Sequence, residues 1–475
     1  MININFEEIY NKLTNKKLDK NQLKAVYSNN NTLVLAGAGC GKSTTIIGKI
    51  IYLIYIKQVN PKNILVLSFT KETVNEMNIK LNDLNIYVNV YTFHKLGLHI
   101  IGNNYNIYNK SLSLYIKKYL LRNIENKVYK KELSRLLNMK NFDLNKTVLI
   151  FEKVINLLKT NEIPNNLNKK EIKLLNYIKQ VYNLYNKYLI KTNQIDFNDM
   201  INISTKKVLN NEYIHNYKYI IVDEFQDISY QRYKLLLTLK NQKNYNLFCV
   251  GDDYQSIYQF AGSKIFLITN FEKYFGKTSI VKINQTYRFS NELAIISSKF
   301  IMKNKNQINK NIKSNKKLNK PVIIINTNKN NINKNLQNYI NKLEYNSTLL
   351  LLGRYTSDIN IIKNDNYIFI NNKIINKYRK DLKIKFYTVH SSKGLEADNV
   401  IILNNLNSTY GFPSKVKSIS LINKLNNIEK NYLLEERRLF YVAITRTKNR
   451  VYLLTIKSKK SIFIKEIKYI IKNMI

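Results

Sequence analysis

The sequence contains no tryptophan, only 4 prolines and only 2 cysteines in 475 residues. Cys40 and Cys249 cannot build a disulfide framework, so a reducing compartment is expected. The chain has no run of about eighteen apolar residues that would cross a membrane, and its start, MININFEEIY, lacks the basic residues of a secretory signal. We expect a soluble intracellular protein, cytoplasmic in a bacterium or virus and nuclear if the source is a eukaryote.

Acidic residues are also scarce, since 77 Lys and Arg against 32 Asp and Glu leave a formal net charge of +45. A polyanion is the partner that such a charge favours, and nucleic acid is the commonest polyanion. The abundance of Lys, Asn, Ile and Tyr is also typical of an AT-rich genome, which adds lysine without regard to function. Charge by itself therefore identifies neither fold nor site.

Arginine and glycine are rare and clustered. Half of the ten arginines and six of the 12 glycines lie in or beside the motifs described below. The arginines are Arg288, Arg354, Arg437, Arg438 and Arg446. Because the composition disfavours these residue types, their clustering indicates segments in which chemistry requires them.

Apolar runs that end in polar or acidic residues alternate with helical patterns, which predicts a parallel α/β sheet with ligands at the carboxyl ends of its strands. The first expected strands are NTLVLAG (31–37), NILVLSF (63–69), YKYIIVDEF (217–225) and NLFCVGDD (246–253). Between about residue 100 and residue 195 the pattern changes to long helices without glycine after Gly102, which predicts a helical insertion between two strands of one sheet. A second α/β series starts at SIVKIN (279–284) and continues through KPVIIIN, STLLLLG, IKFYTVH, NVIILNN and RVYLLT. The Lys/Asn-rich segment 303–319 is expected to be a solvated loop or helix surface.

The stretch AGAGCGKST lies between an expected strand and an expected helix. It fits the phosphate-binding signature G-x-x-x-x-G-K-[ST], except that Ala36 replaces the first glycine. A Cβ is tolerable there if φ stays negative. Lys42 is expected to reach the β- and γ-phosphates, and Ser43 to bind Mg²⁺. The whole predicted nucleotide loop is Ala36, Gly37, Ala38, Gly39, Cys40, Gly41, Lys42, Ser43 and Thr44.

The stretch AGAGCGKST could also be a glycine-containing turn before a helix without any nucleotide. A second motif, IIVDEFQD (220–227), makes that interpretation the weaker one. Asp223 ends an apolar strand, where an aspartate that holds Mg²⁺ is expected. Glu224 follows it and is expected to accept a proton from the water that attacks the γ-phosphate. The two motifs together predict a nucleotide hydrolase that uses ATP and Mg²⁺.

The chain resembles the UvrD/Rep/PcrA kind of superfamily 1A DNA helicase, motif by motif over nearly its whole length. The resemblance implies that Gln22 in LDKNQLKAV contacts the base, Glu396 in TVHSSKGLEAD the ribose, and Gln255 in CVGDDYQSIYQFAGS the γ-phosphate. It makes Arg288 in INQTYRFSNELA and Arg446 in EERRLFYVAITRTKNR the γ-phosphate arginines. The expected catalytic residues are Lys42, Asp223, Glu224, Gln255, Arg288 and Arg446.

Single-stranded DNA contacts are expected to combine aromatic stacking with phosphate binding. The candidates, taken by motif, are Phe69, Thr70, Thr92, His94, Tyr258, Phe260, Arg354 and His390. Tyr258 and Phe260 are favoured because they follow a strand in an otherwise polar segment. The histidines have no Cys/His spacing that would support zinc.

The resemblance also implies the domain organisation: two RecA-like parallel-sheet motor domains, the first with a helical insertion. Residues 1–100 and 196–278 form the first domain, 101–195 the insertion and 279–475 the second domain. The family's large 2B insertion is replaced by residues 355–383 only, so a protein partner in its place is a further expectation. The chain also departs from the family at Ala261, where arginine is usual, and at Ala397, where an aromatic residue is usual.

The leading interpretation is an ATP-dependent single-strand DNA translocase and helicase. The resemblance implies 3′→5′ polarity, action at single/double-strand junctions in repair, recombination or replication, and a monomer without membrane contact. One alternative is a degenerate motor that acts as a basic nucleic-acid-binding accessory protein, but its catalytic set is intact. Another is an RNA-directed superfamily 1 helicase, although VDEFQD, TFH and GFPS favour the DNA-acting branch.

Overall fold

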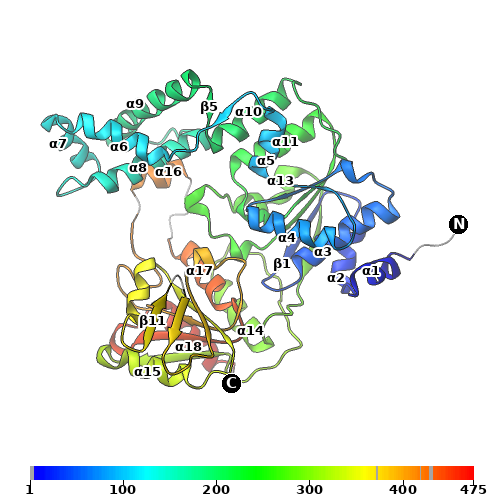
Figure 1. Cartoon of the computed structure of the whole chain (residues 1–475), viewed down its shortest axis with the longest axis vertical. Coiled ribbons are helices and arrows are strands. Elements are labelled where there is room, and N and C mark those ends of the chain that lie inside the picture. Colours follow the sequence, from blue (N-terminus) through cyan, green and yellow to red (C-terminus); the bar gives the residue numbers. More distant parts are fainter. Residues whose placement is uncertain (1–4, 371–372, 418, 427–431, 475) are drawn as a thin grey trace.

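The computed structural model describes residues 5–370, 373–417, 419–426 and 432–474. Two β-sheets built mostly of parallel strands lie in separate α/β domains, and a group of helices extends from the first domain (Figure 1). The predicted fold class, two RecA-like domains with a helical insertion, is confirmed. No helix among the described residues is long and apolar enough to cross a membrane.

The first sheet has six strands in the order β3-β2-β6-β7-β1-β8, all parallel. Parallel pairing brings the carboxyl ends of β1, β6 and β7 to one edge, where the polar residues that follow them gather. The strands are β1 (Thr32–Ala36), β2 (Ile64–Ser68), β3 (Asn89–Thr92), β6 (Tyr219–Val222), β7 (Asn246–Gly251) and β8 (Ser279–Ile283). The helices are α1 (Phe6–Thr14), α2 (Lys20–Tyr27), α3 (Lys42–Ile51), α4 (Lys71–Asn82), α5 (Phe93–Ile101), α10 (Phe197–Leu209), α11 (Tyr230–Gln242), α12 (Phe266–Thr269) and α13 (Phe271–Phe275).

Strand β8 corrects one expectation. The sequence pattern placed residues 279–283 at the start of the second domain, but β8 pairs in parallel with β1 and forms the edge of the first sheet. The next helix, α14 (Asn291–Ile301), packs instead against α17 (Leu433–Ile444) and α18 (Ile462–Lys472) of the second domain. An apolar strand pattern is the same in either sheet, so only the pairing decides to which domain it belongs.

The helical insertion consists of four helices between two short strands. These elements are β4 (Asn106–Ile107), α6 (Leu112–Asn123), α7 (Lys127–Leu136), α8 (Leu144–Thr160), α9 (Lys169–Lys191) and β5 (Gln194–Ile195). Their shared core includes Ile116, Phe151 and Ile178. A helix from the far end of the chain, α16 (Ser420–Leu425), contributes Leu421 and Leu425 to the same core and lies beside α8 in Figure 1.

The second sheet has seven strands in the order β11-β12-β13-β10-β14-β15-β9. The strands are β9 (Val322–Thr327), β10 (Thr348–Gly353), β11 (Tyr367–Ile370), β12 (Lys373–Asn376), β13 (Lys383–Thr388), β14 (Ala397–Ile402) and β15 (Thr447–Ile456). The helices are α14, α15 (Ile332–Ile340), α17 (Leu433–Ile444) and α18 (Ile462–Lys472). Strands β11 and β12 are antiparallel and lie within the segment expected in place of the 2B insertion.

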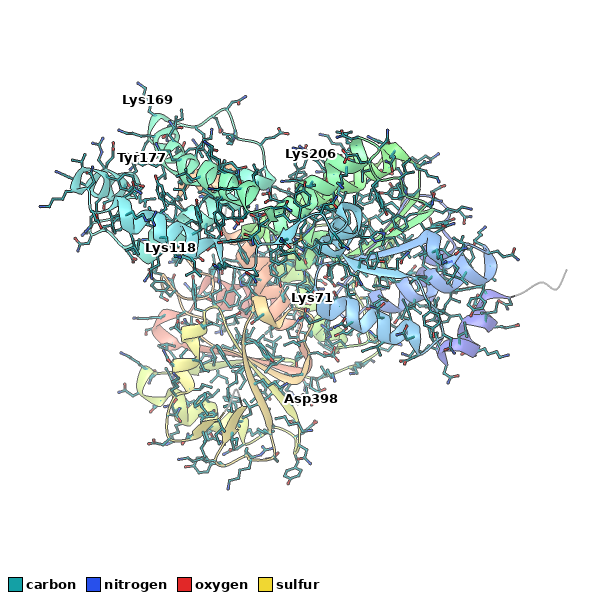
Figure 2. All side chains as sticks on the ribbon, turned by 45° about the horizontal axis from the view of Figure 1, so that its top comes forward. Lys71, Lys118, Lys169, Tyr177, Lys206 and Asp398 are labelled. Atoms are coloured by element: carbon teal, nitrogen blue, oxygen red, sulfur yellow. The ribbon has the colours of Figure 1, made fainter. Side chains whose placement is uncertain are left out.

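The segment between α14 and β9, residues 302–321, is called the linker below. The expectation of a solvated surface over 303–319 holds for most of its residues, which are exposed, but it is wrong for Asn304, Gln307, Lys310 and Ile312, which are buried. The linker crosses the junction of the two domains, whose side chains contact these four residues. Exposed lysines occur within the linker, for example Lys303, Lys305 and Lys317, and elsewhere, for example Lys71, Lys118, Lys169 and Lys206, which are labelled in Figure 2.

Candidate nucleotide and DNA sites

The predicted nucleotide loop connects β1 to α3. Ala36 is the last residue of β1 and is fully buried, and it is not among the residues with positive φ, so its Cβ is accommodated as expected. Gly39 and Gly41 have φ values of 73° and 77°, which favour glycine. Lys42 begins α3, so the loop faces the helix N-terminus, a favourable position for phosphate.

Lys42 and Glu224 form an ion pair within the first domain. Glu224 follows β6 with φ of 51°, an uncommon conformation for a residue with a side chain. Its second carboxylate oxygen accepts a hydrogen bond from Gln226. Burial opposes the charge of Glu224, but Lys42 and Lys393 outweigh it and hold the pKa well below its usual range. Glu224 is therefore ionised, as a proton acceptor must be.

Lys393 reaches this acidic group from the second domain. Its Nζ lies 3.4 Å from Glu224 Oε2, donates to the Gln255 carbonyl at 3.2 Å and also pairs with Asp227. Burial raises the pKa of Asp227 to about 6, and Lys393 opposes that shift. The sequence analysis did not single out Lys393, although its position within TVHSSKGLEAD was the available signal.

Arg446 and Gln255 are joined across the two domains. Gln255 follows β7 of the first sheet, and its Oε1 accepts a hydrogen bond of 2.8 Å from Nη2 of Arg446, which follows α17. Arg446 is 2% exposed, and its burial together with nearby Arg288 lowers its pKa to about 9. The γ-phosphate residues expected from different motifs thus lie together.

Arg288 lies beside Arg446, but it follows a strand of the first sheet and is not part of the second domain, to which the sequence analysis assigned all residues from 279 onward. It belongs to the segment after β8, and neighbouring Tyr287 donates its amide to the Gly39 carbonyl at 3.0 Å. The guanidinium then bonds to the second domain, through Nε to Glu396 at 2.8 Å and through Nη1 to the Thr445 carbonyl at 3.2 Å. Arg288 therefore bridges the domains from the loop side.

Gln22 and Glu396 lie near the two sides of the loop. Gln22 is buried on α2, and a Cβ added at Gly41 would come within 2.6 Å of its Nε2. Glu396 is more open, at 42% side-chain exposure, and pairs with Arg288 and Lys448. These positions are compatible with contacts to a base and a ribose around the phosphate loop.

The residues expected for Mg²⁺ fit the ion. Ser43 is in the first turn of α3, and Asp223 immediately follows β6. Asp223 Oδ1 accepts the Glu224 amide at 2.8 Å, whereas no hydrogen bond to its second oxygen is found among the described residues. Those residues also contain no cluster of three or more His, Cys, Asp or Glu that could hold a metal. One carboxylate and one hydroxyl suit Mg²⁺, which is usually completed by phosphates and water.

Four of the expected DNA contacts gather on the first domain. The threonines cap helices: Thr70 accepts the Thr73 amide at the start of α4, and Thr92 accepts the Lys95 amide at the start of α5. The Phe69 ring is covered on one side by the Arg232 guanidinium, 4.8 Å from its centroid. Helix N-termini next to a cation form a surface that favours phosphate.

His94 belongs to the same surface and touches the exposed ring of Phe197, with a centroid separation of 5.3 Å. Burial, assisted by the charge of Arg232, lowers the pKa of His94 to about 4. His94 is therefore neutral near pH 7. Neither Phe197 nor Arg232 was anticipated from the sequence.

Three of the remaining expected DNA contacts, Tyr258, Phe260 and His390, meet between the domains, whereas Arg354 is paired within the second domain. Phe260 is 50% exposed and packs against His390 with a centroid separation of 5.1 Å, while the Tyr258 hydroxyl donates to the His390 carbonyl at 3.2 Å. Burial lowers the pKa of His390 to about 4. Arg354 pairs with Glu436: Nη2 donates to Oε1 at 2.7 Å, and Nε donates to Oε2 at 3.2 Å, so the charge of Arg354 is already matched within the protein.

Parallel sheets with a phosphate loop, an acidic strand end and arginines at one domain junction define a two-domain P-loop nucleotide hydrolase. Residues 18–276 match the UvrD/REP helicase N-terminal domain, and residues 357–458 match the UvrD-like helicase C-terminal domain. The chain therefore belongs to the UvrD/REP helicase family, as its motifs predicted.

Three relatives illustrate the range of similarity. DNA helicase IV of Escherichia coli is 28% identical over 99% of this chain and 72% of its own length. An ATP-dependent DNA helicase Rep of Buchnera aphidicola is 34% identical over 63% of the chain, and DNA helicase II of Rickettsia typhi is 31% identical over 62%. The chain spans 46% of the length of each of these two relatives.

Proposed function

We propose that this protein is an ATP-hydrolysing DNA helicase that moves along single-stranded DNA. The observation that carries the proposal is the meeting of Lys42 and Glu224 from the first domain with Lys393 and Arg446 from the second. Membership of the UvrD/REP family and the names of the relatives support the choice of DNA.

In the proposed reaction, Glu224 accepts a proton from the attacking water while Lys42, Arg288 and Arg446 stabilise the charge that develops on the γ-phosphoryl group. Lys42 must leave Glu224 to reach the phosphates, so substrate binding itself frees the base. Mg²⁺, held by Ser43 and Asp223, would neutralise charge on the phosphate oxygens. Loss of the γ-phosphate would remove the ligand that holds both domains, and the two domains would move apart.

We propose that this cycle drives movement with 3′→5′ polarity, with Tyr258, Phe260 and His390 contacting the strand between the domains and Phe69, Thr70, Thr92 and His94 contacting it on the first domain. The proposed domain boundaries follow the sequence analysis except that the second domain begins after β8. Unwinding of tailed duplexes, with the tail on either strand end, tests the polarity.

The decisive experiment is ATP hydrolysis by the purified chain, without polynucleotide and then with single-stranded DNA or RNA. We expect strong stimulation by DNA, and loss of at least about 100-fold in kcat in Lys42→Ala because the β- and γ-phosphates lose their cation. Lys468→Ala, an exposed lysine on α18, is the matched control and should be unchanged. Retained DNA binding with no hydrolysis under any condition would favour the accessory-protein alternative, and stimulation by RNA alone would favour the RNA-directed one.

A further inference from the structure

The linker between the two domains is held by buried polar residues. Asn304 donates to the Leu434 carbonyl at 2.9 Å, and Gln307 donates to Asp253 Oδ2 at 2.6 Å. Further along the linker, Lys313 donates its amide to the Asn284 carbonyl and accepts the Thr286 amide, both at 2.8 Å, beside the nucleotide loop. The linker is thus fixed in register with both domains.

Lys310 is the charged centre of these contacts. Its side chain is fully buried, with Nζ 2.8 Å from Asp252 Oδ1, in contact with Asp253, and 3.4 Å from the Tyr254 ring centroid. Both aspartates are also fully buried. Burial opposes the charge of Lys310, but the two carboxylates outweigh it and raise its pKa. Without this cation two buried carboxylates would lie side by side uncompensated, which is costly.

Asp252 connects Lys310 to the nucleotide site. Its Oδ1 faces Lys310, and its Oδ2 accepts a hydrogen bond of 2.7 Å from Gln255 Nε2. The other end of the Gln255 amide accepts Arg446 at 2.8 Å. A continuous series of short contacts therefore runs from the linker through Asp252 and Gln255 to the buried arginine.

We propose that Lys310 is a positioning residue for ATP hydrolysis, which orients Asp252 so that Gln255 and Arg446 are held at the γ-phosphate. This inference rests on the proposed function. Because Lys310 lies in the linker, the orientation of Gln255 and Arg446 would depend on the conformation of the linker between the two domains. Networks in which each member orients the next lose activity sharply when one member is removed.

The test variant is Lys310→Met combined with Asp253→Asn, which removes one positive and one negative charge and leaves the net charge of the cluster unchanged. We expect kcat for ATP to fall about 10- to 100-fold, with KM for ATP and affinity for single-stranded DNA within about threefold of wild type. Lys310→Gln combined with Asp253→Asn, in which the glutamine amide can still donate to Asp252, is the milder second variant if the first does not fold.

A matched control exists in the same chain. Lys159 is a buried lysine between two carboxylates, 2.7 Å from Asp196 and 2.8 Å from Asp199, away from the nucleotide loop. Lys159→Met with Asp199→Asn changes the same charges, and we expect kcat to stay within about twofold of wild type. Thermal unfolding of both double variants reports the structural cost separately.

The same substitutions made in a Gln255→Ala variant distinguish a positioning role of Lys310 from a general loss of stability. If Lys310 acts through Gln255, the linker substitutions should lower kcat by less than about threefold in that background, because the connection is already broken. An unchanged kcat in a folded linker variant, or an equal loss with and without Gln255, would overturn the inference while leaving the helicase proposal intact. A wild-type chain that hydrolyses no ATP would overturn both.

Discussion

In the nucleotide site, charged side chains are joined to one another by hydrogen bonds and ion pairs. The aromatic residues expected to contact DNA pack against one another mainly through their rings. Arg446 is 2% exposed and bonded to Gln255, while Phe260 is 50% exposed and packs on His390. In a buried network of charged groups, the loss of one member weakens the contacts of the others, so the effects of substitutions are not additive. Stacking contacts each add their own contribution to the affinity for DNA. Substitutions in the two regions should therefore differ in size and in additivity.

The largest loss of activity is expected from Arg446→Ala in the nucleotide site. Removing the guanidinium takes away the positive charge that stabilises the transferred phosphoryl group. It also leaves Gln255 Oε1 without its hydrogen bond from Arg446, so kcat for ATP should fall by about 10³-fold or more. Single-stranded DNA affinity without nucleotide should be little changed. Steady-state ATP hydrolysis measures the first quantity, with Arg450→Ala on β15 as the control, and a fall of less than tenfold would contradict the assigned role.

A smaller effect is expected from Phe260→Ala. Loss of one stacking surface should weaken single-stranded DNA binding by about 1–3 kcal/mol and leave DNA-independent ATP hydrolysis unchanged. Fluorescence titration with an oligothymidylate gives the affinity. Tyr469→Ala on α18 removes a ring that is 66% exposed and provides the control. Equal losses in the two variants would indicate a general surface effect rather than a stacking site.

The third effect concerns the pH dependence of stability at His94. Its pKa is about 4 in the folded chain because of burial and Arg232, whereas an unfolded histidine titrates near 6.5. Between these values the unfolded chain binds the additional proton, so this contribution to stability is lost as the pH falls from about 6.5 to 4. The midpoint of thermal unfolding should fall more steeply across that window in wild type than in His94→Gln. Parallel curves would mean that His94 titrates normally.

The same contrast explains what the sequence could predict. Lys42, Asp223 and Gln255 sit in short motifs whose order along the chain is itself informative, and they lie together as expected. Lys310 occupies a Lys/Asn-rich segment that resembles a solvated surface, and only the tertiary position of Asp252 and Asp253 makes it a buried cation. Strand β8 was assigned to the wrong sheet for a related reason, because the local sequence pattern of a strand does not determine which strand it pairs with.

Helix α16 has a consequence for how the protein is made. Its Leu421 and Leu425 complete the core of helices α6 to α9, and Ser420 donates a hydrogen bond of 2.6 Å to Glu171, 249 residues earlier. At a synthesis rate of about 5–20 residues per second, the ribosome needs roughly 12–50 s to produce the missing part. During that interval the nascent insertion exposes apolar surface, and a chaperone that binds such surfaces would find its target there.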